Sequence, residues 1–278
     1  MGKRGRRVLF RAAIVCLGWA CGPGWAGDKP APGAAAGPAC EVAGPQAPRD
    51  IDSRAGANKV SFEAAPKYQE MNLCNIHFHN QAEHKAAEFA LYAGGDRGRG
   101  AGYQCEMSRK LSPKELQAPA ADICKGLRPG DTIEVHWVHS SCDVEPGEGL
   151  ESCVRPACKS PKLRVEAQVF TLVNDPAAPR FGDMVESRQK VDGRHQARSI
   201  PANTGKPVQF AGSTTGPSYD DRTCSGSKVT WSVRPQCAKL DINSVGAWCK
   251  AGNVFAEDHA HGVRKLVTNP MLLAPIQE

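Results

Sequence analysis

The sequence lacks an apolar run long enough to cross a membrane, for which about 20 consecutive apolar residues are needed. The best candidate, residues 8–20, is shorter and is interrupted by Arg11. A short basic stretch precedes it, and small residues follow it as far as Ala26. This pattern predicts a signal peptide over residues 1–26 and no membrane span, so we expect an exported protein, periplasmic or secreted. Lipoprotein anchoring at Cys21 is the alternative, although the residues before this cysteine match the usual lipobox poorly.

A strong charge imbalance is also absent. Five of the 35 Lys and Arg residues lie in the leader, and the chain has 29 Asp and Glu residues, so the part after the leader carries about +1. Proteins that bind nucleic acid or an anionic membrane surface usually have a marked basic excess. The composition therefore predicts neither of these partners.

No Cys-x-x-Cys pair occurs among the 12 cysteines, which argues against a structural zinc ribbon. Ten cysteines remain after the leader, which is an even number, and exported proteins fold in an oxidising compartment. We therefore predict disulfide bonds, although their connectivity cannot be deduced from one sequence. Three of the ten lie in residues 142–161, where disulfides would fasten a long loop rich in Gly, Pro and Glu.

Internal repeats are missing, and only one stretch after the leader has low complexity. Residues 27–50 contain five prolines among alanines and glycines, which is typical of a flexible tether. Residues 51–278 follow without a further break and are long enough to bury a full core. We predict that they form a single domain after the signal peptide (1–26) and the tether (27–50).

Short runs of β-branched and aromatic residues predict four strands, at residues 73–79, 131–138, 163–173 and 228–233. Alternation of apolar and polar residues in the third run predicts a half-buried strand. Only residues 83–92 and 113–124 are credible helices, the second with Ser112 before it and Glu115 in its first turn. The expected fold is mainly β (α+β), with a large, mostly antiparallel central sheet, short peripheral helices and disulfide staples.

Three histidines in two of these strands predict a metal site. His77 and His79 are two residues apart, so their side chains point to the same face of a strand. His136, from the strand at residues 131–138, can supply a third imidazole. Three histidines around zinc leave one coordination position open for water, which is the arrangement of a catalytic site and not of a closed structural one.

Four segments resemble, in the same order, motifs of the bacterial α-class carbonic anhydrases: residues 77–84, 134–139, 212–217 and 229–231. They carry a His-Phe-His run followed by Glu-His, a Glu-x-His-x-Val-His strand, a Gly-Ser loop with Thr-Thr, and a Val-Thr-Trp strand. The chain is more similar still to the δ-class or δ-like carbonic anhydrases, in which His-x-His, Glu-His and His-Trp-Val-x-Ser-Ser-Cys recur. The resemblance implies an α-carbonic-anhydrase-like fold and a zinc enzyme that reversibly hydrates CO2 to bicarbonate and a proton by zinc-bound hydroxide. Its partners would be the small molecules CO2 and bicarbonate, and the sequence indicates no oligomeric state.

The resemblance also implies roles for residues around the metal. Glu134 would support His136. Glu83 would accept a hydrogen bond from Thr214, which in turn would hydrogen-bond the zinc-bound hydroxide and orient it. Thr215 would contact the leaving bicarbonate.

Other residues would shape the surroundings of the metal. Val138, two residues beyond His136 in the same strand, and Trp231 would line the pocket for CO2. His84 and His139 would be buried structural residues, as their counterparts in the family are.

Two departures from the family pattern concern the catalytic loop and the proton shuttle. Ser213 stands directly before Thr214, where the family has a leucine, so that Ser213 or Thr215 could take the place of Thr214. The fastest α-class enzymes have a shuttle histidine upstream of the His-x-His strand, and no histidine precedes His77. The unassigned candidates for a shuttle are His195, His259 and His261.

Two other kinds of protein remain open. His77, His79 and Glu83 fit the first motif of a cupin, in which Glu83 would be a ligand of iron or manganese. A cupin would have a Gly soon after Glu83, and this Gly is missing here. The later segments, residues 134–139, 212–217 and 229–231, have no counterpart in the cupin motifs. The second alternative is a non-catalytic carbonic-anhydrase-related binding protein. The His259-Ala260-His261 triplet could also form a second, exposed metal site.

Overall fold

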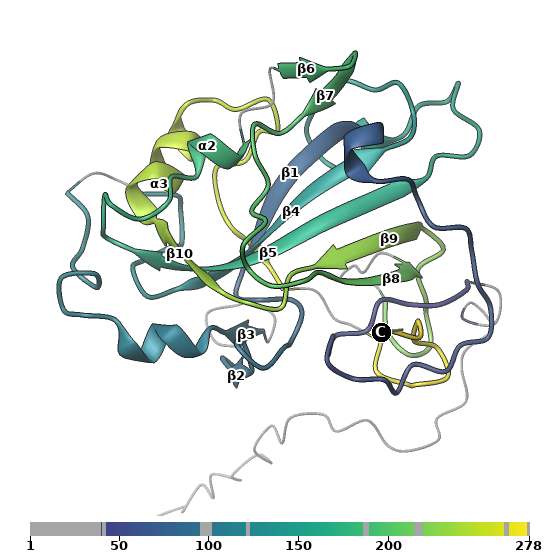
Figure 1. Cartoon of the computed structure of the whole chain (residues 1–278), viewed down its shortest axis with the longest axis horizontal. Helices are drawn as coiled ribbons and strands as arrows, with labels where there is room; N and C mark the ends of the chain where they lie inside the picture. The colour runs from purple at the N-terminus through teal and green to yellow at the C-terminus, as the bar shows by residue number, and fades with distance from the viewer. Residues whose placement is uncertain are drawn as a thin grey trace, which may run out of the picture. The chain divides into compact units, whose positions relative to one another are not determined.

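A seven-stranded mixed sheet forms the centre of the structure (Figure 1). The structure is a computed structural model, and it describes residue 40 and residues 43–94, 102–120, 123–185, 189–213, 219–263 and 267–276. The strand order is β11-β1-β4-β5-β9-β8, and β10 pairs with β5 outside this path. The strands are β1 (Asn72–Asn80), β4 (Thr132–Ser140), β5 (Leu163–Val173), β8 (Val208–Ser213), β9 (Lys228–Val233), β10 (Ala238–Asp241) and β11 (His261–Gly262). The three longest pairings, β1 with β4, β4 with β5 and β8 with β9, are antiparallel, and the three shorter ones are parallel.

The remaining elements are short. Two small hairpins pair β2 (Leu91–Tyr92) with β3 (Tyr103–Gln104) and β6 (Gln189–Val191) with β7 (Arg194–Gln196). The helices are η1 (Tyr68–Glu70), η2 (Glu106–Lys110), η3 (Leu150–Cys153), α2 (Gly182–Val185) and α3 (Ile242–Lys250). Within the described residues, none of the helices has the length and apolar character needed to cross a membrane. The four predicted strands coincide with β1, β4, β5 and β9, and the prediction of a strand-rich fold with a large sheet and few short helices is confirmed.

The predicted helix at residues 83–92 is wrong, because this segment forms hydrogen bonds with other parts of the chain. The backbone N–H of Lys85 donates to the carbonyl of Arg49 at 2.7 Å, and that of Ala87 donates to a carboxylate oxygen of Asp52 at 2.8 Å. In a helix over these residues the N–H of Ala87 would instead donate to the carbonyl of Glu83, and Leu91–Tyr92 would not form β2. Long-range pairing therefore outweighs the local helical tendency.

The predicted helix at residues 113–124 is also wrong, although its start signal is present. Ser112 and Glu115 form the reciprocal hydrogen bonds of a capping box, at 2.8 and 3.3 Å between the backbone nitrogens and side-chain oxygens. Only one turn follows, and Leu116 in that turn stays exposed. Without a packed apolar face, further turns are not stabilised.

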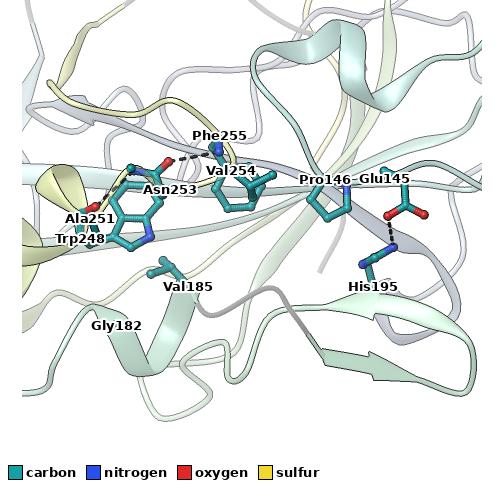
Figure 2. A pocket seen from close by; sticks show the side chains of 11 residues that line it. Glu145, Pro146, Gly182, Val185, His195, Trp248, Ala251, Asn253, Val254 and Phe255 are labelled. Carbon is teal, nitrogen blue, oxygen red and sulfur yellow. Dashed lines mark hydrogen bonds and ion pairs between the residues drawn. The ribbon is translucent and has the colours of Figure 1, made fainter.

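The sheet is covered on both faces, and the helices α2 and α3 cover one of them (Figure 1). Phe78 of β1 and Trp137 of β4 point to this face and pack with Phe181 and Val245 in what we call the helix-side cluster. The surface over this cluster is hollowed between α2 and the residues after α3 (Figure 2). Because neighbouring residues of a strand point to opposite faces, His77, His79 and His136 lie on the other face.

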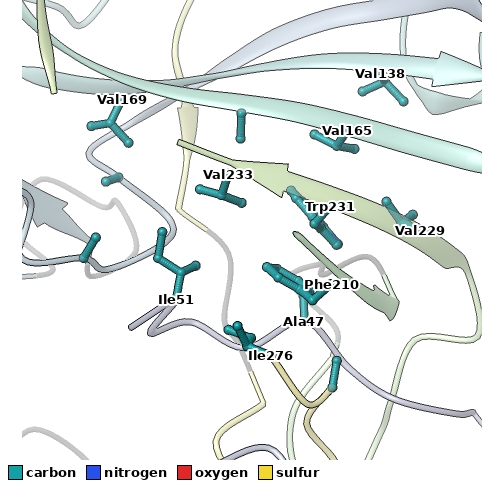
Figure 3. Packing of buried hydrophobic residues seen from close by; sticks show 14 of the residues in the cluster. Ala47, Ile51, Val138, Val165, Val169, Phe210, Val229, Trp231, Val233 and Ile276 are labelled. Carbon is teal, nitrogen blue, oxygen red and sulfur yellow. The ribbon is translucent and has the colours of Figure 1, made fainter. Parts of the chain in front are cut away.

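The second cluster lies on the histidine face and includes Val138, Val165, Phe210 and Trp231 (Figure 3). We call it the strap-side cluster, because residues 43–51 cover it. β5 therefore packs on both faces, and only Leu163 among its residues is not buried. The prediction of a half-buried strand is wrong for this reason.

Residues 43–51, the N-terminal strap, are held against the domain, although the sequence places residues up to 50 in a flexible tether. Gln46 forms bridges with Ser213 and Leu273, and its side chain bonds the backbone N–H and carbonyl of Ser225 at 2.9 and 3.0 Å. A Cβ on Gly212 would lie 2.9 Å from the backbone of Ala47, so a side chain there would push the strap away. The predicted signal peptide and the first part of the predicted tether lie outside the described residues.

All ten cysteines from Cys40 onward are paired, which confirms the prediction of disulfides. The bonds join Cys40 to Cys224, Cys74 to Cys153, Cys105 to Cys237, Cys124 to Cys249 and Cys142 to Cys158. Two of these bonds fasten the loop at residues 142–161, one by closing it and one by joining it to β1.

Candidate metal centre

The antiparallel pairing of β1 and β4 brings three imidazoles together. His77 is paired with His136 in the register, and His79 with Glu134. One nitrogen from each of His77, His79 and His136 lies within 4.8 Å of the others, and all three side chains are buried. The predicted convergence of the three histidines on one point is thus present in the structure.

Each of these imidazoles has an oxygen atom beside its outer nitrogen. Nδ1 of His77 lies 2.7 Å from Oδ1 of Asn75, and Nδ1 of His79 lies 3.1 Å from the carbonyl oxygen of Gly262. Nε2 of His136 lies 2.8 Å from Oε1 of Glu134. Because an oxygen acceptor holds the proton on the nearer ring nitrogen, the inner nitrogens present lone pairs.

The inner nitrogens are Nε2 of His77, Nε2 of His79 and Nδ1 of His136. Nε2 of His77 and Nδ1 of His136 are only 3.2 Å apart. Two lone pairs that face each other at this distance repel, and a cation between them removes the repulsion. The donor set therefore fits a dication such as zinc, for which imidazole nitrogen is a common ligand.

Glu134 is buried and accepts four hydrogen bonds. Its Oε1 accepts from His136 and from Nδ1 of His84, the latter at 2.6 Å, and its Oε2 accepts from the backbone N–H groups of Glu83 and His84 at 2.7 and 2.9 Å. Burial raises the pKa of Glu134, but the neighbouring His84 and His136 outweigh it and hold the pKa well below its usual value. The carboxylate stays ionised and can keep the His136 ring in one orientation.

His84, Glu134 and His136 form a second group with the spacing of metal ligands. Burial lowers the pKa of His84, but the Glu134 carboxylate outweighs this and raises the pKa above its usual value. Each imidazole can donate an N–H hydrogen bond to Glu134. These hydrogen bonds account for the short distances between the ring nitrogens and the carboxylate without a metal ion. We therefore interpret this group as a hydrogen-bond network around the candidate metal centre.

Glu83 is buried beside the three histidines, with Oε2 at 3.5 Å from Nε2 of His79. In the part of the chain that the structure describes, the group with ligand spacing contains His77, His79 and His136 but not Glu83. This arrangement does not match the ligand set of a cupin. Thr214 and Thr215, the predicted partners of Glu83 and of bicarbonate, lie outside the described residues.

An apolar wall stands next to the histidines. Trp231 and Val138 are buried in the strap-side cluster, and the Trp231 ring stacks on Phe210 with centroids 6.2 Å apart (Figure 3). The centroid of the Trp231 ring lies 5.4 Å from that of His136 and 5.0 Å from that of His84. The wall suits a small uncharged molecule beside the metal position.

Two neighbours of the histidines were not identified from the sequence, and a third was named without a definite role. Asn75 could have been found, because it lies two residues before His77 on the same strand face. Gly262 acts through a backbone carbonyl on β11, which no sequence pattern marks. His261, whose role the sequence left unassigned, has its ring centroid 5.9 and 6.2 Å from those of His77 and His79.

The other two unassigned histidines lie elsewhere. His259 is exposed and lies beside Asp258, with its ring centroid 5.1 Å from that of His261. His195 lies on β7, where its Nε2 is 2.8 Å from Oε2 of Glu145. Among the described residues, His259 and His261 belong to no group of three with ligand spacing.

Residues 68–244 match the family model described as delta carbonic anhydrase. Three solved structures show low similarity: the α-carbonic anhydrase of Thermovibrio ammonificans with the inhibitor sulfanilamide, the α-carbonic anhydrase of Photobacterium profundum, and a hyperthermostable carbonic anhydrase from a hydrothermal vent chimney. Their identities are 14, 16 and 16%, and their TM-scores are 0.24, 0.28 and 0.26. The matches cover 82, 86 and 82% of this chain and 88, 90 and 88% of those chains. No curated protein matches the sequence.

Proposed function

Since this chain belongs to the delta carbonic anhydrase family, by a match that spans residues 68–244, we propose that it is a zinc enzyme that reversibly hydrates CO2 to bicarbonate and a proton. The observation that supports this proposal best is the convergence of inner nitrogens from His77, His79 and His136. When bound, zinc lowers the pKa of a coordinated water to about 7 and thereby supplies hydroxide at neutral pH.

The residues of the chain would hold and orient the reacting groups. Asn75, the Gly262 carbonyl and Glu134 would keep the three imidazoles in the tautomer that binds metal. Val138 and Trp231 would accept CO2 against the apolar wall and exclude water from it. An uncharged substrate needs no ion pair at this position.

The roles of Glu83, Thr214 and Thr215 form a further part of the proposal. Glu83 would accept a hydrogen bond from the hydroxyl of Thr214, and the Thr214 oxygen could then only accept a hydrogen bond from the attacking oxygen. This would turn a lone pair of the attacking oxygen toward the carbon of CO2. Thr215 would bond the product bicarbonate.

Metal analysis combined with stopped-flow CO2 hydration on the purified protein tests the proposal. We expect about one zinc per chain and a hydration rate well above that of buffer. A zinc-replete preparation indistinguishable from buffer would instead favour the non-catalytic, binding relative.

Two variants separate metal binding from rate. His136→Ala removes an inner nitrogen and should abolish zinc retention. Thr214→Ala should retain zinc and lose about 100-fold in rate, because an oriented hydrogen-bonding group near the reacting atoms typically contributes this much. If both variants lose zinc, or both keep the wild-type rate, the proposed division of roles is wrong.

We also propose that residues 1–26 direct export and that the protein is periplasmic or secreted. Five disulfides among the described residues support an oxidising compartment. Mass spectrometry of the protein from its native host should show an unmodified N-terminus after Ala26. A diacylated Cys21 would instead identify a lipoprotein.

A further inference from the structure

A cavity of about 520 Å³ opens over the helix-side cluster, on the face of the sheet opposite the three histidines (Figure 2). Its walls come from α2, from the end of α3 and the turn after it, from β7, and from the loop after β4. Small-molecule sites in proteins have cavities of about this size. Neither the family match nor the proposed reaction assigns this cavity a role.

One end of the cavity is apolar. Trp248, Val185, Val254 and Phe255 line it, and Figure 2 shows these side chains around a common space. Phe181 packs against the Trp248 ring, with the ring centroids 5.0 Å apart and the ring planes at 87° to each other. Trp248 is only partly buried, and Val254 is 52% exposed although it is apolar.

The other end of the cavity carries a negative charge. Oε2 of Glu145 lies 2.8 Å from Nε2 of His195, and this hydrogen bond lowers the pKa of Glu145, so the carboxylate is ionised at neutral pH. Among the residues that the structure describes, no Lys or Arg lines the cavity. Lys190 approaches Glu145 at 3.6 Å, which is longer than a direct hydrogen bond, so the carboxylate can exchange this partner for a ligand cation that bonds it directly.

We propose that this cavity binds a small organic cation, an arylalkylammonium. Its ring would pack against Trp248 and Val254, and its ammonium group would bond Glu145. An anion of the same shape would face the carboxylate, and a neutral molecule would lack the charge-assisted hydrogen bond. The proposal rests on the cavity alone and is independent of zinc and of CO2 hydration.

Three matched probes test the proposal by calorimetry and by the fluorescence of Trp248: 2-phenylethylamine, 2-phenylethanol and phenylacetate. Among the described residues the other two tryptophans, Trp137 and Trp231, are buried, so a bound ring should change the Trp248 emission most. We expect saturable binding of one amine per chain, at least tenfold weaker binding of the alcohol and no binding of phenylacetate. Absence of saturable amine binding, or equal binding of amine and phenylacetate, overturns the proposal.

Variants of the full chain locate the site. Glu145→Gln should weaken amine binding at least tenfold, and Val254→Lys, at an exposed position, should do the same by placing a cation in the cavity. Glu63→Gln, which removes an exposed carboxylate paired with Lys162 elsewhere, should bind like the wild type. The His136→Ala variant should bind the amine normally, which separates this site from the metal centre. Unchanged binding by Glu145→Gln excludes the proposed site.

Discussion

At the scale of single residues, Glu134 links the proposed metal ligands to the rest of the protein. It accepts four hydrogen bonds and donates none, so both oxygens must be acceptors. An amide at this position would place an NH2 group against N–H donors. The geometry therefore requires a carboxylate, and glutamine, which has nearly the same shape, is the appropriate test.

We expect Glu134→Gln to lower the zinc affinity by about 10- to 100-fold, as is usual when a partner of a ligating histidine is lost. Competition with a chelator of known affinity measures the change. Glu166→Gln is the matched control, because Glu166 is also buried and charge-paired but lies on the helix side of the sheet. Equal zinc affinity of Glu134→Gln and the wild type would show that Glu134 does not orient His136.

His139 makes stability depend on pH. Burial lowers its pKa from 6.5 to about 3, so the imidazole is neutral in the folded protein. The unfolded chain binds a proton at this residue below pH 6.5, and the folded protein does so only near pH 3. The contribution is therefore fully present above pH 6.5 and is lost as the pH falls from 6.5 toward 3.

Over this range His139 should reduce the free energy of unfolding by about 1.4 kcal/mol per pH unit. Urea unfolding at several pH values should give a shallower loss for His139→Gln than for the wild type. Identical slopes for His139→Gln and the wild type would show that His139 titrates normally.

At the scale of elements, one face of β1 presents the proposed metal ligands and the other face packs in the core. His77 and His79 face the metal position, whereas Phe78 between them is buried against Phe181 and Trp248, with ring centroids 6.0 and 6.2 Å away. Because the strand also pairs with β4 through its backbone, the loss of one core side chain should not displace the histidines.

We expect Phe78→Ala to lower the free energy of unfolding by about 3 to 5 kcal/mol, as is usual for the removal of a buried phenylalanine. The folded fraction should still bind zinc with nearly the wild-type affinity. Denaturant unfolding and chelator competition on the same preparation separate the two effects. A loss of zinc affinity comparable to that of Glu134→Gln would show that the two faces are coupled.

The elements that could be predicted are those whose signal lies within a single strand, in its residue types and their spacing. β1, β4, β5 and β9 were predicted because their residues are apolar and β-branched in short runs, and the histidine spacing then placed three ligands on one face. Burial of β5 on both faces was missed, because the residues that cover its second face are distant in sequence. The two-residue β11 carries no pattern, so the Gly262 carbonyl beside His79 could not be predicted.

At the scale of the whole molecule, the N-terminal strap joins parts of the chain that are far apart. The backbone N–H of Ser213 donates to the carbonyl of Pro45 at 2.8 Å, and the Gln46 side chain bonds the backbone of Ser225. The carbonyl of Lys85 accepts from the N–H of Ile51 at 2.9 Å, next to the segment that bonds Glu134. The proline-rich composition of residues 27–50 suggested a tether, because buried hydrogen bonds and a disulfide partner are not visible in composition. Disulfide connectivity was unpredictable for the same reason.

The Cys40–Cys224 disulfide anchors this strap and joins residues 184 positions apart, whereas Cys142–Cys158 joins residues 16 positions apart. By loop-closure entropy, replacing both cysteines with serine should cost about 5 kcal/mol of unfolding free energy for the first pair and about 3 kcal/mol for the second. Loss of the first pair should also lower the hydration rate while zinc is retained, because the strap bonds Ser213, which directly precedes Thr214. Urea unfolding, metal analysis and stopped-flow hydration on both double variants measure these effects. If the Cys142/Cys158 variant loses as much rate as the Cys40/Cys224 variant, the rate reports general destabilisation and the strap has no specific influence on the metal centre.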